Sequence, residues 1–222
     1  MVERFDRHQK NRGRKMKKNL SVNISTSNSK LGGFIPTLNL PAVVTCRCNA
    51  PCRKTCYACK GNFNYPNVKA NHLNNLEQFI QNQERFKNDI IYFLNNGLIS
   101  YKYFRWHSSG DIINANYFLM MVEIARKTPQ TKFLCFTKKY EIVNGFLSGG
   151  GTIPKNLSIV FSAWDESWKF DNPFNLPVAY VRFKKGLNSN IPETAKECGG
   201  LCSQCQKCWN LKNGEAVVFN QH

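Results

Sequence analysis

Short apolar segments alternate with helical segments along most of this chain. Strand-like runs cover residues 38–45, 101–110, 132–138, 157–164 and 177–183, the second running into a Ser-Ser-Gly turn. Apolar residues recur with a period near 3.6 over 68–94, 115–125 and 140–147, which predicts helices between the strands. Strands joined by helices form parallel sheets, because a parallel connection must cross over the sheet. The sequence therefore predicts an α/β fold, namely a partial or closed (β/α) barrel with parallel strands.

Nine of the ten cysteines fall into two groups. The first group forms a loop after the first predicted strand and consists of Cys46, Cys48, Cys52, Cys56 and Cys59. The second forms a C-terminal extension with the spacing C-x3-C-x2-C-x2-C and consists of Cys198, Cys202, Cys205 and Cys208. The charged N-terminus lacks the apolar stretch of a secretory signal, so we expect a reducing, cytoplasmic location in which such thiols bind metals. Cys135 lies in an apolar strand and is expected to be a core thiol.

Two metal chemistries fit these spacings. Structural zinc takes four ligands in a tetrahedron and often uses two C-x2-C pairs, so the C-terminal group alone could hold zinc. Iron-sulfur clusters also use closely spaced thiolates. Three thiolates at consecutive short intervals can each point at a different iron of a cubane, which favours one or two 4Fe-4S clusters, with zinc as the alternative.

The chain is strongly basic. Thirty-one Lys and Arg residues stand against fourteen Asp and Glu residues, a formal charge of +17. Eight basic residues crowd the first eighteen positions, and such a run usually stays disordered until it meets phosphate. We therefore expect nucleic acid to bind the arm and the surface, with a merely solubilising tail as the alternative. No apolar run approaches the roughly 18 residues of a membrane span, which predicts no membrane partner.

These patterns divide the chain into three regions. Residues 1–29 form a basic, flexible arm, 30–190 an iron-sulfur α/β barrel-like domain, and 191–222 a cysteine-rich cluster segment. In a parallel sheet the functional sites lie at the carboxyl ends of the strands. The first cysteine loop, the SSGD turn at 108–111 and the FTKK turn at 136–139 all fall at such ends, so we expect them to converge.

Three side chains near these turns are candidates for the chemistry of the site. His107 is either a ligand or proton donor or an ordinary packed or surface residue of its strand. Asp111 either holds an ammonium group through a charge-assisted hydrogen bond or caps the following helix. Lys138 either holds a carboxylate or phosphate or is an ordinary exposed lysine at the end of a strand.

The C-x3-C-x2-C spacing after a first strand resembles the cluster loop of the radical S-adenosylmethionine enzymes. The resemblance implies that Cys52, Cys56 and Cys59 hold a 4Fe-4S cluster whose fourth iron binds S-adenosylmethionine; the alternative triad is Cys46, Cys52 and Cys56. It implies an auxiliary cluster for the C-terminal group. It also implies cofactor-binding roles for the loop tyrosine and for the segment resembling the family's GGE-type motif, together Tyr57, Ser108, Ser109, Gly110 and Asp111.

Three longer segments resemble a phage-borne family known as gene product 88. They read SKLGGFIPTLNLPAVVTCRCNAPCRKTCYACKG, FRWHSSGD and CSQCQKCW. That resemblance implies a mobile-element origin and an iron-sulfur barrel, but no reaction. We expect an iron-sulfur protein. It is either a radical S-adenosylmethionine-like enzyme acting on a nucleic acid or nucleotide, or a non-enzymatic module that binds nucleic acid or a host protein, with inhibition of a host system as one role of such a module.

Overall fold

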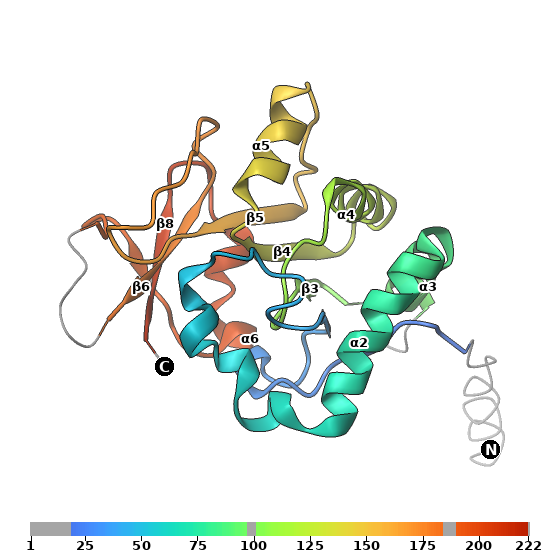
Figure 1. Ribbon diagram of the computed structural model, residues 1–222. Helices are drawn as coiled ribbons and strands as arrows, with labels where there is room; N and C mark the ends of the chain where they lie inside the picture. The colour runs from blue at the N-terminus through green and yellow to red at the C-terminus, as the bar shows by residue number, and fades with distance from the viewer. Residues whose placement is uncertain (1–18, 97–100, 184–189, 222) are drawn as a thin grey trace, which may run out of the picture.

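The computed structural model describes residues 19–96, 101–183 and 190–221 (Figure 1). Eight strands form one sheet in the order β1-β2-β3-β4-β5-β6-β8-β7. All neighbouring strands are parallel except β1 and β2. The predicted α/β fold with parallel strands is confirmed. The outer strands β1 and β7 do not pair with each other in the described chain, so closure into a barrel is not confirmed.

The elements have the following bounds. The strands are β1 (Ile24–Ser25), β2 (Thr37–Leu38), β3 (Tyr103–Trp106), β4 (Lys132–Thr137), β5 (Leu157–Ser162), β6 (Val178–Arg182), β7 (Lys196–Glu197) and β8 (Ala216–Asn220). The α-helices are α2 (Pro66–Gln81), α3 (Gln83–Asn96), α4 (Ala115–Lys127), α5 (Tyr140–Ser148) and α6 (Cys202–Cys205). Short 3-10 helices are η1 (Ser29–Leu31), η2 (Pro51–Thr55), η3 (Tyr57–Cys59), η4 (Gly61–Asn64) and η5 (Lys207–Asn210).

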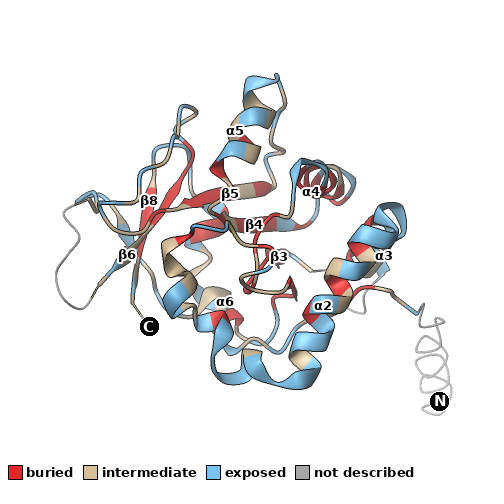
Figure 2. Ribbon diagram, viewed as in Figure 1, coloured by how far each residue is buried: buried red, intermediate tan, exposed pale blue. Residues whose placement is uncertain are grey.

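The helical predictions are confirmed in place. The long periodic stretch forms two helices in tandem, because Asn82 leaves the helical conformation (φ −154°, ψ 85°) and its side chain accepts a hydrogen bond from the Arg85 amide at 2.9 Å. Helices α3, α4 and α5 pack their apolar sides on one face of the sheet, where Phe86, Trp106 and Tyr117 are fully buried (Figure 2). No helix in the described ranges combines the length and apolar character that crossing a bilayer requires.

The first strand is much shorter than expected. The prediction of a strand over 38–45 is wrong, because β2 ends at Leu38. Proline has no amide hydrogen to donate to a neighbouring strand, and Pro41 instead starts a turn in which its carbonyl accepts from the Thr45 amide (3.2 Å) and hydroxyl (3.0 Å). This turn leads directly into the first cysteine loop.

The second face of the sheet is covered by the C-terminal segment. Trp209 is buried there, donating its indole N–H to the Phe104 carbonyl at 3.1 Å, and it packs with Leu134, Val160 and Val217 in a second, smaller core. The segment then returns to the sheet as β8, which pairs with β6 along its whole length and was not predicted. The C-terminal cysteines are thereby fixed against the sheet, opposite helices α4 and α5 (Figure 1).

Candidate functional site

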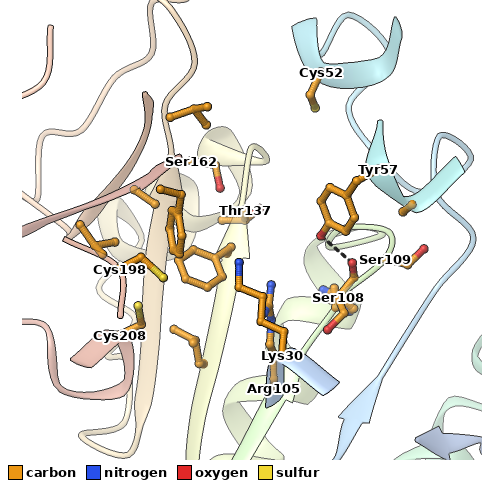
Figure 3. A pocket seen from close by; sticks show the side chains of 18 of the residues that line it. Lys30, Cys52, Tyr57, Arg105, Ser108, Ser109, Thr137, Ser162, Cys198 and Cys208 are labelled. Carbon is orange, nitrogen blue, oxygen red and sulfur yellow. Dashed lines mark hydrogen bonds between the residues drawn. The ribbon is translucent and has the colours of Figure 1, made fainter. Parts of the chain in front are cut away.

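One cavity of about 630 Å³ lies on the face of the sheet that the C-terminal segment covers. Both cysteine groups line it, although they are far apart in the sequence. The cysteines on its wall are Cys46, Cys52, Cys56, Cys198, Cys202, Cys205 and Cys208. Figure 3 shows Cys52 on one side of this space and Cys198 and Cys208 on the other. The predicted convergence of the cysteine loop with the SSGD and FTKK turns is also seen, since all three contribute to the wall.

The first cysteine group divides into residues inside and outside the cavity. Cys46, Cys52 and Cys56 line it, whereas Cys48 and Cys59 are exposed and do not. Cys59 nevertheless stays beside Cys56, because its amide donates to the Cys56 carbonyl at 3.1 Å in helix η3. Burial raises the pKa of Cys46 to about 11, and burial also raises the pKa of Cys56. The cavity wall thus contains the alternative triad of the sequence analysis.

The second group lines the cavity with all four thiols. Cys202 and Cys205 begin and end helix α6, and Cys208 lies in η5. A Cβ atom on Gly199 would stand 3.3 Å from the Cys205 sulfur, so glycine allows this thiol to approach the chain closely. Burial raises the pKa of Cys208 to about 12, and the neighbouring thiols of the group act in the same direction.

The donor set suits a thiophilic metal. All ten cysteines are free, and soft thiolates select zinc and iron-sulfur clusters. In the described ranges, no three His, Cys, Asp or Glu side chains surround a single point closely enough to hold one metal ion. Zinc would bind four such thiolates around one ion, whereas an iron-sulfur cluster would bind thiolates at separate iron atoms. Ligation would also hold these buried sulfurs as thiolates, against the effect of burial on their pKa values.

Side chains from two other segments form hydrogen bonds with the backbone of the SSGD segment. The Asn39 side-chain oxygen accepts from the amides of Ser108 (2.8 Å) and Ser109 (3.2 Å). The Tyr57 hydroxyl reaches across from the cysteine loop and donates to the Ser108 carbonyl at 2.6 Å, as Figure 3 shows. The predicted cofactor-binding residues Tyr57, Ser108, Ser109 and Gly110 therefore stand together on the cavity wall.

Asp111 joins the ends of two strands. Its Oδ1 accepts from the Thr137 hydroxyl and the Ile112 amide, each at 2.7 Å, and its Oδ2 accepts from the Lys138 amide at 2.9 Å. Burial raises the pKa of this carboxyl, and these hydrogen bonds act in the opposite direction. Capping of the next helix by Asp111 is wrong, because Asn114 is the N-cap of α4 and accepts from the Tyr117 amide. Its role in holding an ammonium group stays a prediction.

Two cationic residues of the cavity were missed by the sequence analysis. Arg105 on β3 and Lys30 in η1 extend into the space between the cysteine groups (Figure 3). Strand alternation carried a signal for Arg105, since Phe104 and Trp106 face the helices and the residue between them must face the other way. Lys138 lines the cavity as well, and its ammonium group lies 5.7 Å from the centre of the Trp164 ring.

His107 is not suited to donate a proton at neutral pH. It is buried, its Nε2 lies 2.9 Å from the Tyr117 hydroxyl, and its Nδ1 has no hydrogen-bond partner in the described chain. Burial lowers the pKa of His107 to about 3, and the nearby Arg105 charge acts in the same direction. The ring is therefore neutral in the folded protein near pH 7.

This shift predicts a pH dependence of stability. Because the folded pKa lies below the unfolded value of about 6.5, the unfolded state binds the proton more readily as pH falls. The stabilisation from keeping His107 neutral is present above the unfolded pKa of about 6.5 and is lost as the pH falls toward the folded pKa. Between about pH 6.5 and 5.5 we expect the unfolding free energy to drop by about 1 kcal/mol more in the native chain than in His107→Gln. Urea unfolding of both at each pH measures this, and parallel pH profiles would contradict it.

The fold and the cavity define a mostly parallel α/β protein with a thiol-lined cavity. The sequence matches the protein family described as Gene product 88 over residues 6–181. This range covers most of the chain, and the protein belongs to that family. The match includes the first cysteine group and the SSGD turn, while the second cysteine group lies beyond it. No curated protein and no solved structure matches significantly.

Proposed function

We propose that this protein is an iron-sulfur protein and that the cavity is its functional site. The observation that carries the proposal is that seven cysteines, from two segments far apart in the sequence, line one cavity. A structural zinc site would use four thiolates around one ion and would not need a second group of cysteines on the other side of the cavity. The residues assigned to the two clusters are the cavity thiols of each group, with Cys59 as the alternative third ligand of the first.

The finer proposal is a radical S-adenosylmethionine-like enzyme that acts on a nucleic acid or nucleotide. It is supported by the position of Tyr57 and the SSGD turn, which stand beside the first cysteine group at the carboxyl ends of the strands. A cluster with this cofactor supplies one-electron chemistry for hydrogen abstraction. In such a reaction the chain's own part is to hold the ligand on the cavity wall and to exclude water.

A second candidate is a non-enzymatic module that binds nucleic acid or an acidic host protein. The formal charge of +17 favours this candidate, because a field of that size gathers polyanions. In that case the clusters would stabilise the fold or sense the redox state. The basic stretch at residues 1–18, which the sequence analysis assigned to nucleic acid, lies outside the described residues.

The test is anaerobic purification followed by counts of iron, zinc and acid-labile sulfide per chain. We expect iron and sulfide in equal amounts, at about four or about eight of each. Zinc without sulfide would overturn the iron-sulfur proposal. With iron present, S-adenosylmethionine and a reductant are then added, and 5'-deoxyadenosine is measured. Its formation supports the enzyme, and its absence with salt-dependent binding of nucleic acid supports the binding module.

A further inference from the structure

The cavity is strongly electropositive. Among the residues that the structure describes, six basic residues line its wall, namely Lys30, Arg47, Lys60, Arg105, Lys138 and Lys207. Asp111 is the only carboxylate among these described lining residues, and both of its oxygens accept hydrogen bonds from the chain. Arg47 is also engaged, since it forms an ion pair with Glu141 at 3.0 Å. Positive charge in a partly enclosed space attracts anions more strongly than the same charge on an open surface.

Arg105 lines this cavity and has a hydrogen-bond donor that no described group uses. Its guanidinium lies 5.2 Å from the centre of the Phe136 ring, and its Nε is buried without a hydrogen-bond partner in the described chain. A buried donor without an acceptor destabilises the protein, and a ligand oxygen that accepted from the guanidinium would reduce this cost.

Lys30 brings a second positive charge to the same space from a different segment of the chain. It lies in η1, and its ammonium group is 5.3 Å from the centre of the Phe219 ring. Burial raises the pKa of Cys202, and the charges of Arg105 and Lys30 act in the opposite direction, which places both cations near this thiol. Figure 3 shows the two side chains reaching into the space between Cys198 and Tyr57.

We propose that Arg105 and Lys30 bind the phosphate group of a phosphate monoester in this cavity. Two neighbouring cations are better matched by a dianionic phosphate than by a carboxylate with a single negative charge. The planar guanidinium can also donate two parallel hydrogen bonds to phosphate oxygens. A volume of about 630 Å³ is in the range of small-ligand sites. The proposal deepens the proposed function, on which it rests for the role of the cavity, by naming its ligand class.

The test measures binding to the anaerobically purified protein by calorimetry. The probes are AMP and inorganic phosphate, with adenosine and acetate as the uncharged and monoanionic comparisons. We expect AMP and phosphate to bind, and Arg105→Gln to weaken both by about tenfold to a hundredfold, the loss expected for one charge-assisted hydrogen bond. The proposal is overturned if Arg105→Gln binds as the native chain does, or if adenosine or acetate binds as tightly as AMP.

Arg126→Gln is the matched control. Arg126 is exposed on α4, donates to the Thr152 carbonyl (3.1 Å) and hydroxyl (3.3 Å), and is not among the residues that line the cavity. This variant removes the same charge, and we expect its AMP affinity to stay within about twofold of the native value. A loss equal to that of Arg105→Gln would mean that net charge alone attracts AMP, which overturns the site.

A measurement on the native chain covers the case in which Arg105→Gln fails to fold. Phenylglyoxal modifies arginine side chains, and mass spectrometry gives the rate at each arginine. AMP is expected to slow the modification of Arg105 by about tenfold and to leave Arg126 unchanged. Equal rates at Arg105 with and without AMP would overturn the proposal.

Iron content measured in parallel separates this proposal from the proposed function. Arg105→Gln that keeps its iron and loses AMP binding supports the phosphate site. Arg105→Gln that loses iron and still binds AMP overturns it, because Arg105 would then serve as the counter-charge of the thiolates. Native protein that lacks iron and sulfide, yet binds AMP through Arg105, overturns the iron-sulfur proposal and leaves the phosphate site intact.

Discussion

Gly110→Ala is expected to lower the unfolding free energy by roughly 3 kcal/mol. Gly110 has a φ of +85°, which costs about 1–2 kcal/mol for a residue with a Cβ. A Cβ there would stand 2.7 Å from Leu40 Cβ and Thr45 Oγ1, and 2.9 Å from the Leu40 carbonyl oxygen. The carbonyl belongs to the backbone, so it cannot turn away as a side chain can. Relief of this overlap requires the turn before the cysteine loop to move.

The variant Gly150→Ala separates the cost of the positive φ from the cost of the steric overlap. Gly150 has nearly the same φ, +81°, but a Cβ on it would meet nothing within 4 Å. It should therefore lose only the conformational part, about 1 kcal/mol. Urea unfolding of both variants gives the comparison, and equal losses would show that Gly110 is not closely packed. Because the moving turn leads to Cys46, Gly110→Ala should also lower the iron content, whereas Gly150→Ala should not.

The elements predicted best from sequence are those with a strong local signal. Helix α4 has apolar residues at helical spacing, and Phe118, Val122 and Ala125 are buried as expected. The strands β3, β4 and β5 are short apolar runs joined by α4 and α5, and their parallel pairing follows from these helical connections. In these segments, local pattern and tertiary packing agree.

The elements that were missed depend on partners far away in the sequence. Strand β8 is five residues long and follows a cysteine segment, so only its pairing with β6 identifies it as part of the sheet. Strand β1 has two residues and pairs antiparallel with β2, itself cut short before Pro41. Segments this short have no periodicity to detect, and the neighbouring strand decides their conformation.

The site was predictable as a set of residue types but not as an arrangement. The spacing revealed both cysteine groups, and the parallel topology indicated which turns would meet. That the groups face one cavity depends on how Trp209 fixes the C-terminal segment to the sheet, which no local pattern encodes. Lys30 comes from a short 3-10 helix and left no signal, whereas the alternation of β3 would have revealed Arg105.

Cys56→Ser is expected to remove the iron of the first cluster, about four atoms per chain if two clusters are present. Cys56 belongs to both candidate triads and lines the cavity. A serine hydroxyl is a far harder ligand than a thiolate, and thiolates are what hold iron-sulfur clusters. Cys48→Ser is the matched control, because Cys48 lies in the same loop but is exposed and outside the cavity. Equal iron in both variants would contradict the assignment of this loop to a cluster.

The third ligand of this cluster is decided by Cys46→Ser and Cys59→Ser. Cys46 lines the cavity beside Cys52 and Cys56, whereas Cys59 is exposed at the outer end of η3. We therefore expect Cys46→Ser to lose about four iron atoms and Cys59→Ser to keep them. The opposite result would mean that Cys59, and not Cys46, completes the first cluster. Iron and sulfide counts on the two variants distinguish the two triads.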